Sequence, residues 1–256
     1  MDHVVTLLPG GVAGTLAILA VGVVAGFFNV TAGGGSLLTL PLLVLLGLPS
    51  PVANGTNRVA IVIQNLVAVP TFRHGGVRGL RRALPLVLLA LPGTILGAWA
   101  GVVVSDALFR RVIAVTMVVL AGVVLLSRRP AGGEETGERP FRPVTLLAFA
   151  LLGFYAGFIQ AGIGFFIVFA LAGLERFPLV RAHAFKVTVV LALQCVALPV
   201  FALGGMVRWA PGLALAAGLS LGGFIGARTA LRSSERFLRA LLGFAAVVLA
   251  IKLLLS

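Results

Sequence analysis

A stripe of polar side chains runs along one apolar stretch in the first half of the chain. At 100° per residue, Asn54, Arg58 and Asn65 share one helical face, and Asn57 and Gln64 lie on an adjacent face. This stripe should face the protein interior, because polar groups are expensive on an apolar exterior. A guanidinium can hold an oxyanion through two parallel hydrogen bonds, so Arg58 is a candidate for anion binding or gating. The alternative is an arginine that extends its charge to the end of the apolar stretch.

A second set of polar residues follows in the sequence RAHAFKVTVVLALQC. His183, Lys186 and Gln194 fall within about a quarter-turn of one another on a helix. We take Lys186 as the counterpart of Arg58 and Gln194 as the counterpart of Asn65. One cation in each half suits an anion that passes between the halves, whereas the alternative makes Lys186 an ordinary charge at a helix end. His183 could carry a proton near neutral pH, or lie at a helix end without that role.

Glycine-rich breaks accompany both sets. In NVTAGGGS, residues 29–36, each of three consecutive glycines costs about 1 kcal/mol relative to alanine in a helix, so a helix should end there. Free backbone N–H groups at such a break suit an anion, and Asn29, Thr31 and Ser36 add side-chain donors. The matching stretch IQAGIG offers Gln160 as its strong donor. The alternative is that the glycines only permit close packing of helices.

These groups together form a candidate substrate-binding site. Its members are Asn29, Thr31, Gly33, Gly34, Gly35, Ser36, Asn54, Thr56, Asn57, Arg58, Asn65, Gln160, Gly162, Gly164, His183, Lys186 and Gln194. The sequence has no zinc-ligand spacing, nucleotide-binding loop or catalytic triad, and its apolar stretches hold almost no carboxylate. We therefore expect no metal, no cofactor and no catalytic residue. A membrane-embedded enzyme is the disfavoured alternative, because it would need a converging nucleophile, acid and base.

The elements that must position this site occur twice, at an offset of 129 residues. Matching pairs are Gly33 and Gly162, Gly35 and Gly164, Pro70 and Pro199, Gly76 and Gly205, and Gly97-Ala98 and Gly226-Ala227. We expect one repeat at 1–128, a second at 143–256, and a polar linker at 129–142 that is rich in glycine, proline and charge. A doubled, apolar chain with glycine-broken helices is typical of membrane transporters.

Composition excludes a soluble protein. Apolar residues make up 60% of the chain, charged residues 11%, and the mean hydropathy is +1.15, whereas soluble proteins carry about a quarter charged residues. Because the apolar runs lack two-residue alternation, we expect an all-α integral membrane protein. Eight runs are long enough to span a bilayer: 9–30, 52–72, 83–104, 108–127, 143–161, 181–203, 210–231 and 236–255. Two shorter runs, 37–48 and 165–174, are expected to be broken or re-entrant segments.

The basic residues indicate how the halves are oriented. The net charge is +13, and the basic residues lie at the ends of apolar runs. At these places, signals for membrane orientation and contacts with lipid headgroups explain the charge better than binding of nucleic acid does. If the two repeats have inverted topology, 15 of the 20 basic residues fall on one side of the membrane. If the repeats are parallel, the charges split roughly evenly. The positive-inside rule therefore favours inverted repeats with both termini outside.

Longer motifs resemble the TauE/SafE sulfite exporter family. In the first half these are SLLTLPLLVLLGLPSPVANGTN, residues 36–57, and RHGGVRGLRRALP, residues 73–85. In the second half they are AGIGFFIVFAL, residues 161–171, and LGGFIGARTALRSSERFLRALLG, residues 221–243. Since the motifs consist mostly of glycine and apolar residues, they define the family well and the substrate poorly.

The resemblance implies a multi-pass permease of the inner membrane, with sulfite, sulfonates or related sulfur-containing anions as substrates. The second repeat departs from the pattern, because Ile163 interrupts its glycines and Ala184-Phe185 stand where Thr56-Asn57 stand in the first. We expect a secondary transporter that works by alternating access between its repeats, with a passive anion channel as the alternative. The expected partners are a small anion and membrane lipid, without nucleic acid, and a homodimer is compatible with the resemblance.

Overall fold

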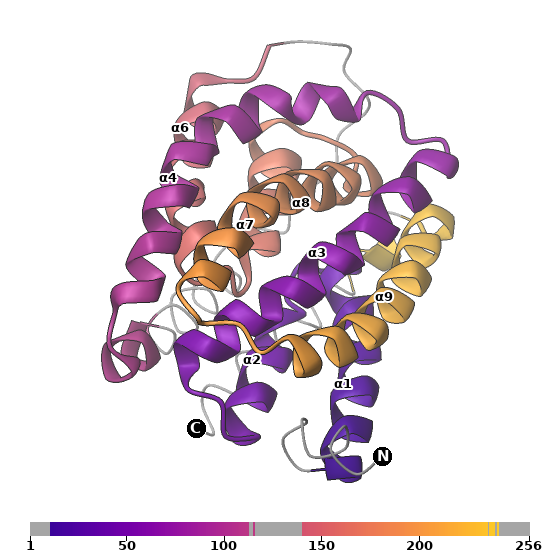
Figure 1. Cartoon of the computed structure of the whole chain (residues 1–256). Helices are drawn as coiled ribbons and strands as arrows, with labels where there is room; N and C mark the ends of the chain where they lie inside the picture. The colour runs from indigo at the N-terminus through magenta and orange to yellow at the C-terminus, as the bar shows by residue number, and fades with distance from the viewer. Residues whose placement is uncertain (1–10, 113–114, 116–139, 235, 239, 241–256) are drawn as a thin grey trace.

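The computed structural model describes residues 11–112, 115, 140–234, 236–238 and 240, and every regular element among them is helical. The first half contains α1 (Gly11–Thr31), α2 (Ser36–Leu45), α3 (Ser50–His74), the short η2 (Leu80–Ala83) and α4 (Leu84–Val103). The second half contains α6 (Pro143–Phe158), α7 (Ile163–Phe169), the π-helical η3 (Ala170–Leu174), α8 (Leu179–Leu203) and α9 (Trp209–Arg232). The all-α prediction is confirmed for these residues (Figure 1).

Six of the eight predicted long runs coincide with helices, and both short runs lie in the helices that follow the breaks. The predicted spans 108–127 and 236–255, and the linker 129–142, fall mostly outside the described residues. By length and composition, four described helices could cross a membrane: α1, α8, α9 and the segment Leu80–Val103. Among the others, α6 has only 16 residues. α3 has 25 residues, enough for about 37 Å, but its polar stripe lowers its hydropathy.

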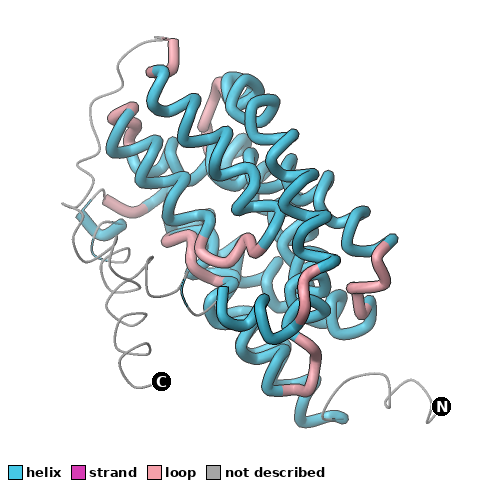
Figure 2. Tube along the Cα trace, turned by 90° about the vertical axis from the view of Figure 1, so that its left-hand side faces the viewer, coloured by secondary structure: helices cyan, strands magenta, loops and turns pink. Residues whose placement is uncertain are grey.

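The helices of the two halves interlock instead of forming two separate bundles. α1 packs along α9, and α4 packs along α6 (Figure 1). Figure 2 shows the described helices packed together in one bundle. Both contacts use small residues, since Gly22 meets Gly218 in the first pair and Gly157 meets Thr94 in the second. Removing a side chain at such positions lets two helix backbones approach closely. The first helix of each half therefore packs against the last described helix of the other half.

α3 and α8 occupy equivalent places in the repeat but run antiparallel. Near the start of α3, Gly55 packs against Phe201 and Met206 at the end of α8. Beyond the other end of α3, Gly79 lies beside Arg181 at the start of α8. The two halves thus present equivalent helices in opposite directions.

Each half opens with a helical hairpin. Just past η3, Glu175 accepts hydrogen bonds from the Arg142 N–H at 3.0 Å and from the Thr145 hydroxyl, both at the start of α6. The hairpin of α6 and α7 therefore starts and ends at the same end of the bundle. α2 likewise leads through a short turn into the start of α3, and α1 runs parallel to α9, which begins at that end. The two hairpins consequently enter the bundle from opposite ends.

The tips of the hairpins touch at glycines. α1 ends at Thr31 and α2 begins at Ser36, so the predicted break is present, and Gly33 within it has a φ of +92° that favours glycine. A Cβ placed on Gly164 would lie only 2.5 Å from the Cα of Gly33. The glycines therefore interrupt the helices and also permit close packing, so the alternative that they only permit packing does not account for the break.

We predict that Gly164→Ala destabilises the protein by about 1–3 kcal/mol, because the new methyl group would lie 2.5 Å from the Cα of Gly33 and would force that backbone to shift. The measurement is the thermal midpoint in detergent, followed by size-exclusion chromatography. Gly173→Ala is the matched control, since a Cβ there meets nothing within 4 Å. Equal midpoints for the two variants would contradict the close contact of the tips.

The start of α3 is held by a carboxylate from elsewhere in the chain. No side chain of its own caps this end of α3. Instead, Asp106 beyond α4 accepts a hydrogen bond from the Ser50 N–H at 2.6 Å through Oδ1 and pairs with Arg110 at 2.9 Å through Oδ2. The Ser50 N–H is the main cause of a lowered pKa of Asp106. Asp106 therefore fixes the helix that carries the polar stripe.

We predict that acidification from about pH 6 to about pH 3 lowers the thermal midpoint of the wild type more than that of Asp106→Asn. The pKa of Asp106 is lower in the folded protein than the unfolded value near 4, so its stabilisation is present above that value and is lost as the pH falls through the folded pKa. Because the side chain is 39% exposed, the effect should lie at the low end of the about 0.5–2 kcal/mol typical of helix caps. Parallel pH profiles for the two proteins would contradict this role.

Candidate functional site

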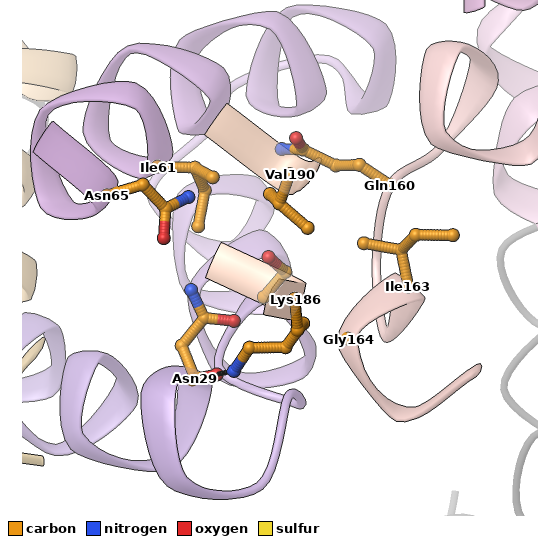
Figure 3. Close-up of a pocket in the computed structure, with 9 residues that line it drawn as sticks. Asn29, Ile61, Asn65, Gln160, Ile163, Gly164, Lys186 and Val190 are labelled. Atoms are coloured by element: carbon orange, nitrogen blue, oxygen red, sulfur yellow. Dashed lines mark hydrogen bonds between the residues drawn. The ribbon is translucent and has the colours of Figure 1, made fainter. Parts of the chain in front are cut away.

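A small cavity lies where the two hairpin tips meet α3 and α8 (Figure 3). Its volume is about 10 Å³, which is room for about one water molecule. Residues of both halves line it: Asn29, Ser36, Ile61, Asn65, Gln160, Ile163, Gly164, Lys186 and Val190. All of them except Asn29 are buried. The breaks and the central helices that the sequence singled out therefore do meet at one place.

Lys186 holds the end of α1 at the edge of this cavity. Its Nζ donates to the backbone oxygens of Asn29 at 2.5 Å and Val30 at 2.8 Å. The last carbonyls of a helix have no helical partner, and the helix dipole favours a cation beside them. Two of the three N–H bonds of the ammonium are used in this way, and the third remains for the cavity that Lys186 lines. With 2% exposure, Lys186 is not an ordinary charge at a helix end.

Arg58 holds the end of α6 in the same manner. Nη1 donates to the backbone oxygen of Ala156 at 3.0 Å and to Gln194 Oε1 at 2.6 Å. Nη2 donates to the backbone oxygens of Gly157 and, at 3.3 Å, Phe158. Arg58 is fully buried, so the alternative that it extends to the end of the apolar stretch is wrong. Unlike Lys186, it does not line the cavity.

The helix boundaries correct the pairing of the two cations. α3 and α8 both have 25 residues and begin 129 residues apart. At this offset Gln194 does correspond to Asn65, but Lys186 corresponds to Asn57 and Arg58 to Val187. The predicted match of Ala184-Phe185 with Thr56-Asn57 is wrong for the same reason, because Phe185-Lys186 stand there. The two cations are therefore not at equivalent positions. They are alike in what they bind, since each holds the last turn of the first helix of the other half.

Two amide side chains at the cavity have atoms without a hydrogen-bond partner among the described residues. These atoms are Nδ2 of Asn65 and both amide atoms of Gln160. Gln160 lies in the second break with a φ of +58°, in the left-handed region. A buried polar atom without a partner costs about 1–3 kcal/mol, and a ligand with acceptor oxygens would offset this cost for the two amide nitrogens. The cavity thus presents two amide donors that the protein itself does not satisfy, beside one unpaired acceptor, Oε1 of Gln160.

The interior stripe of α3 is confirmed, because Asn54, Asn57, Arg58, Gln64 and Asn65 are all at most 1% exposed. Some of these residues support the breaks without lining the cavity. Asn57 donates to the Ser36 hydroxyl at 3.2 Å, and its Oδ1 accepts from the Thr39 hydroxyl at 2.8 Å. Asn54 donates to the backbone oxygen of Phe158 at 2.9 Å. These bonds connect the start of α2 and the end of α6 to α3.

Thr31, Thr56 and His183 of the predicted site do not line the cavity. Thr56 accepts a hydrogen bond from the Arg208 N–H at 3.0 Å, and Thr31 donates to the backbone oxygen of Phe27 at 2.7 Å within α1. His183 is fully buried, and neither ring nitrogen has a partner in the described part of the chain. The predicted glycines lie in or beside the breaks, and Gly164 alone lines the cavity.

Three apolar residues of the cavity wall were absent from the predicted site, namely Ile61, Ile163 and Val190. Their residue types carry no distinguishing signal in so apolar a chain. Ile61 and Val190 are nevertheless matched at the repeat offset and stand one helical turn from Asn65 and Lys186. Other apolar residues of the two central helices are matched in the same way, so this pairing does not single out Ile61 and Val190.

Several apolar helices, together with a buried polar cavity between interlocked halves, define a multi-pass α-helical membrane protein. The chain belongs to the sulfite exporter TauE/SafE family, whose profile matches residues 18–253. It is 30% identical over 226 residues to a "probable membrane transporter protein" of Haemophilus influenzae, covering 88% of each chain. Identity is 28% over 233 residues with "probable membrane transporter protein ORF9" of Sinorhizobium, covering 90% of this chain and 88% of the relative. It is 29% over 235 residues with "probable membrane transporter protein YfcA" of Escherichia coli K12, covering 91% and 87%.

No solved structure matches the chain. The family and these relatives place the protein among membrane transporters and not among enzymes.

We predict that Asn65→Leu leaves the thermal midpoint of the ligand-free protein unchanged or higher, because it removes a buried amide nitrogen that has no partner. Gln194→Leu, at the matched position of the other repeat, should lower the stability by about 1–3 kcal/mol. It breaks bonds to Arg58 at 2.6 Å and to the backbone oxygen of Ala156 at 3.3 Å. Thermal melts in detergent without anion test the pair. A larger loss for Asn65→Leu than for Gln194→Leu would contradict the assignment of the unpaired amide.

Proposed function

We propose that this protein is a carrier for a small sulfur-containing oxyanion, such as sulfite or an organosulfonate. The observation that carries the proposal is the meeting of the Lys186 ammonium with the unpaired amides of Asn65 and Gln160 at one buried cavity. An oxyanion brings a negative charge and several acceptor oxygens, so it can accept hydrogen bonds from the Lys186 ammonium and from both amide nitrogens at once. The family description, sulfite exporter, supports sulfur as the central atom.

The walls of the cavity favour an anion over a cation. Ile61, Ile163 and Val190 exclude water, which strengthens the attraction between Lys186 and a bound anion. No carboxylate lines the cavity among the described residues. A cation there would face the buried charge of Lys186 without an opposite charge to balance it.

Alternating access is supported by the small size of the cavity. A volume of about 10 Å³ holds one water and not an oxyanion of four or more heavy atoms, so the described conformation is closed around its site. Opening requires the hairpin tips to separate from α3 and α8. Inverted repeats are supported by the antiparallel course of α3 and α8, and two such halves can open the site to each side in turn by rocking.

The distribution of charge supports a location in the inner membrane with both termini outside. Arg58 and Lys186 lie in the interior, so they do not count as loop charges. Without them the described loops remain strongly asymmetric. The end of the bundle formed by η2, the start of α6 and the start of α8 carries the following basic residues: Arg73, Arg78, Arg81, Arg82, Arg142, Arg176 and Arg181. The opposite end carries Arg110, Arg111 and Arg208.

The test is counterflow of labelled sulfite or a sulfonate in vesicles reconstituted with the purified protein. We expect saturable uptake, a KM raised about three- to tenfold in Asn65→Leu at an unchanged maximal rate, and no uptake in Lys186→Met. Asn65→Leu separates the site from folding, because this variant should remain fully stable.

Arg111→Met is the matched control for the loss of one positive charge, since Arg111 is exposed and does not line the cavity. Flux that rises without saturation and shows no counterflow would indicate that the protein is a channel and not a carrier. Wild-type kinetics in Asn65→Leu and Lys186→Met, with equal protein inserted, would reject the cavity as the substrate site.

A further inference from the structure

The terminal N–H groups of Arg58 are all used within the protein, and Arg58 does not line the cavity. Its four terminal N–H bonds go to Ala156, Gly157, Phe158 and Gln194, and Nε is its one donor without a partner in the described part of the chain. Its guanidinium carbon lies 4.3 Å from the centroid of the Phe201 ring, so one face of the group is also covered. An oxyanion could reach the terminal N–H groups only by replacing the carbonyls of a helix end.

The carbonyls that Arg58 holds lead directly into the second break. α6 ends at Phe158, and Gln160 follows in the left-handed region with a φ of +58°. Such a conformation is unfavourable for a residue other than glycine and persists only when its surroundings fix it. The Tyr155 hydroxyl, which donates to the backbone oxygen of Ala161, holds the far side of the same turn. Arg58 and Tyr155 thus hold the turn on both sides of Gln160.

We propose that Arg58 is a positioning residue that aims the Gln160 amide at the substrate by fixing the carboxyl end of α6. This inference rests on the proposed function, because Gln160 is taken to bind the transported anion. The guanidinium acts through three backbone oxygens and does not touch the anion itself.

The two cations therefore divide their tasks. Lys186 uses two of its three donors on the end of α1 and lines the cavity, so it both holds a helix end and faces the anion. Arg58 uses all of its terminal donors on the protein, so it holds a helix end only. A fork of several donors suits this task better than a single ammonium, because it can bind three successive carbonyls at once.

A double-mutant cycle on transport tests the proposal. The proteins are the wild type, Arg58→Lys, Gln160→Asn and the double variant, with asparagine chosen because it tolerates the left-handed region. We expect Arg58→Lys and Gln160→Asn each to raise the KM about three- to tenfold, the range for one misdirected hydrogen bond. The double variant should have the KM of Gln160→Asn alone, because Arg58 then has no amide left to aim.

Two further combinations sharpen the cycle. Arg58→Lys combined with Asn65→Leu should multiply the two single effects, because Asn65 lies on α3 and not in the turn that Arg58 holds. Phe201→Leu removes the ring beneath the guanidinium, and we expect it to raise the KM in the same direction by a smaller factor. This milder variant decides the question if Arg58→Lys does not fold. Multiplication of the effects of Arg58→Lys and Gln160→Asn would overturn the proposal and assign Arg58 a direct or purely structural role.

Hydrogen exchange gives a readout that does not depend on transport. We expect Arg58→Lys to speed exchange of the backbone amides at 159–164 at least about tenfold, with no change at 32–36, where Lys186 holds the other break. Equal acceleration in both breaks, or none, would overturn the positioning role. Absence of saturable flux in the wild type would reject the proposed function. The exchange experiment would still decide whether Arg58 holds the turn that contains Gln160.

Discussion

The structure depends on how two interrupted helices satisfy their carbonyl ends inside an apolar protein. A helix that stops within a membrane exposes backbone oxygens that water cannot reach, and each unsatisfied group costs several kcal/mol. Here the end of α6 is held by Arg58 and the end of α1 by Lys186, each from the opposite half. The cations are in turn made tolerable by those oxygens, because a buried charge needs hydrogen bonds to offset its lost hydration. The interrupted helices therefore require the buried cations, and the cations require the carbonyls of the helix ends.

This mutual requirement also explains why the site lies where it does. The hairpin tips can meet only where glycines remove the side chains, as at Gly33 and Gly164, and there the central helices supply polar groups. The protein satisfies most of these groups through crossed bonds such as that from Asn54 to the end of α6. Of the polar groups that remain unpaired, those of Asn65 and Gln160 meet Lys186 at one cavity. In the proposed function, the substrate binds to donors that are not used to hold the breaks.

Much of this arrangement could be predicted from the sequence because its causes are local. Three consecutive glycines end a helix wherever it packs, and a polar stripe such as that of Asn54, Arg58 and Asn65 must turn inward in an apolar chain. The partners of Arg58 and Lys186 could not be predicted, because backbone oxygens have no residue type. The same reason hid Ile61 and Val190, which resemble every other apolar residue on the central helices. The one-residue error in pairing Lys186 with Arg58 came from matching charge to charge instead of keeping the offset of 129 that the helix boundaries obey.

The packing of α1 along α9 has a consequence for biosynthesis. α1 leaves the ribosome early, but its partner begins only at Trp209, about 180 residues later. At about 5–20 residues per second, the first helix waits about 10–35 s in the lipid without its final neighbour. For most of that interval the carbonyls at its end also lack Lys186. α1 therefore reaches its final packing only after α9 has been synthesised, late in translation. A nascent chain truncated before α9 leaves α1 without its packing partner.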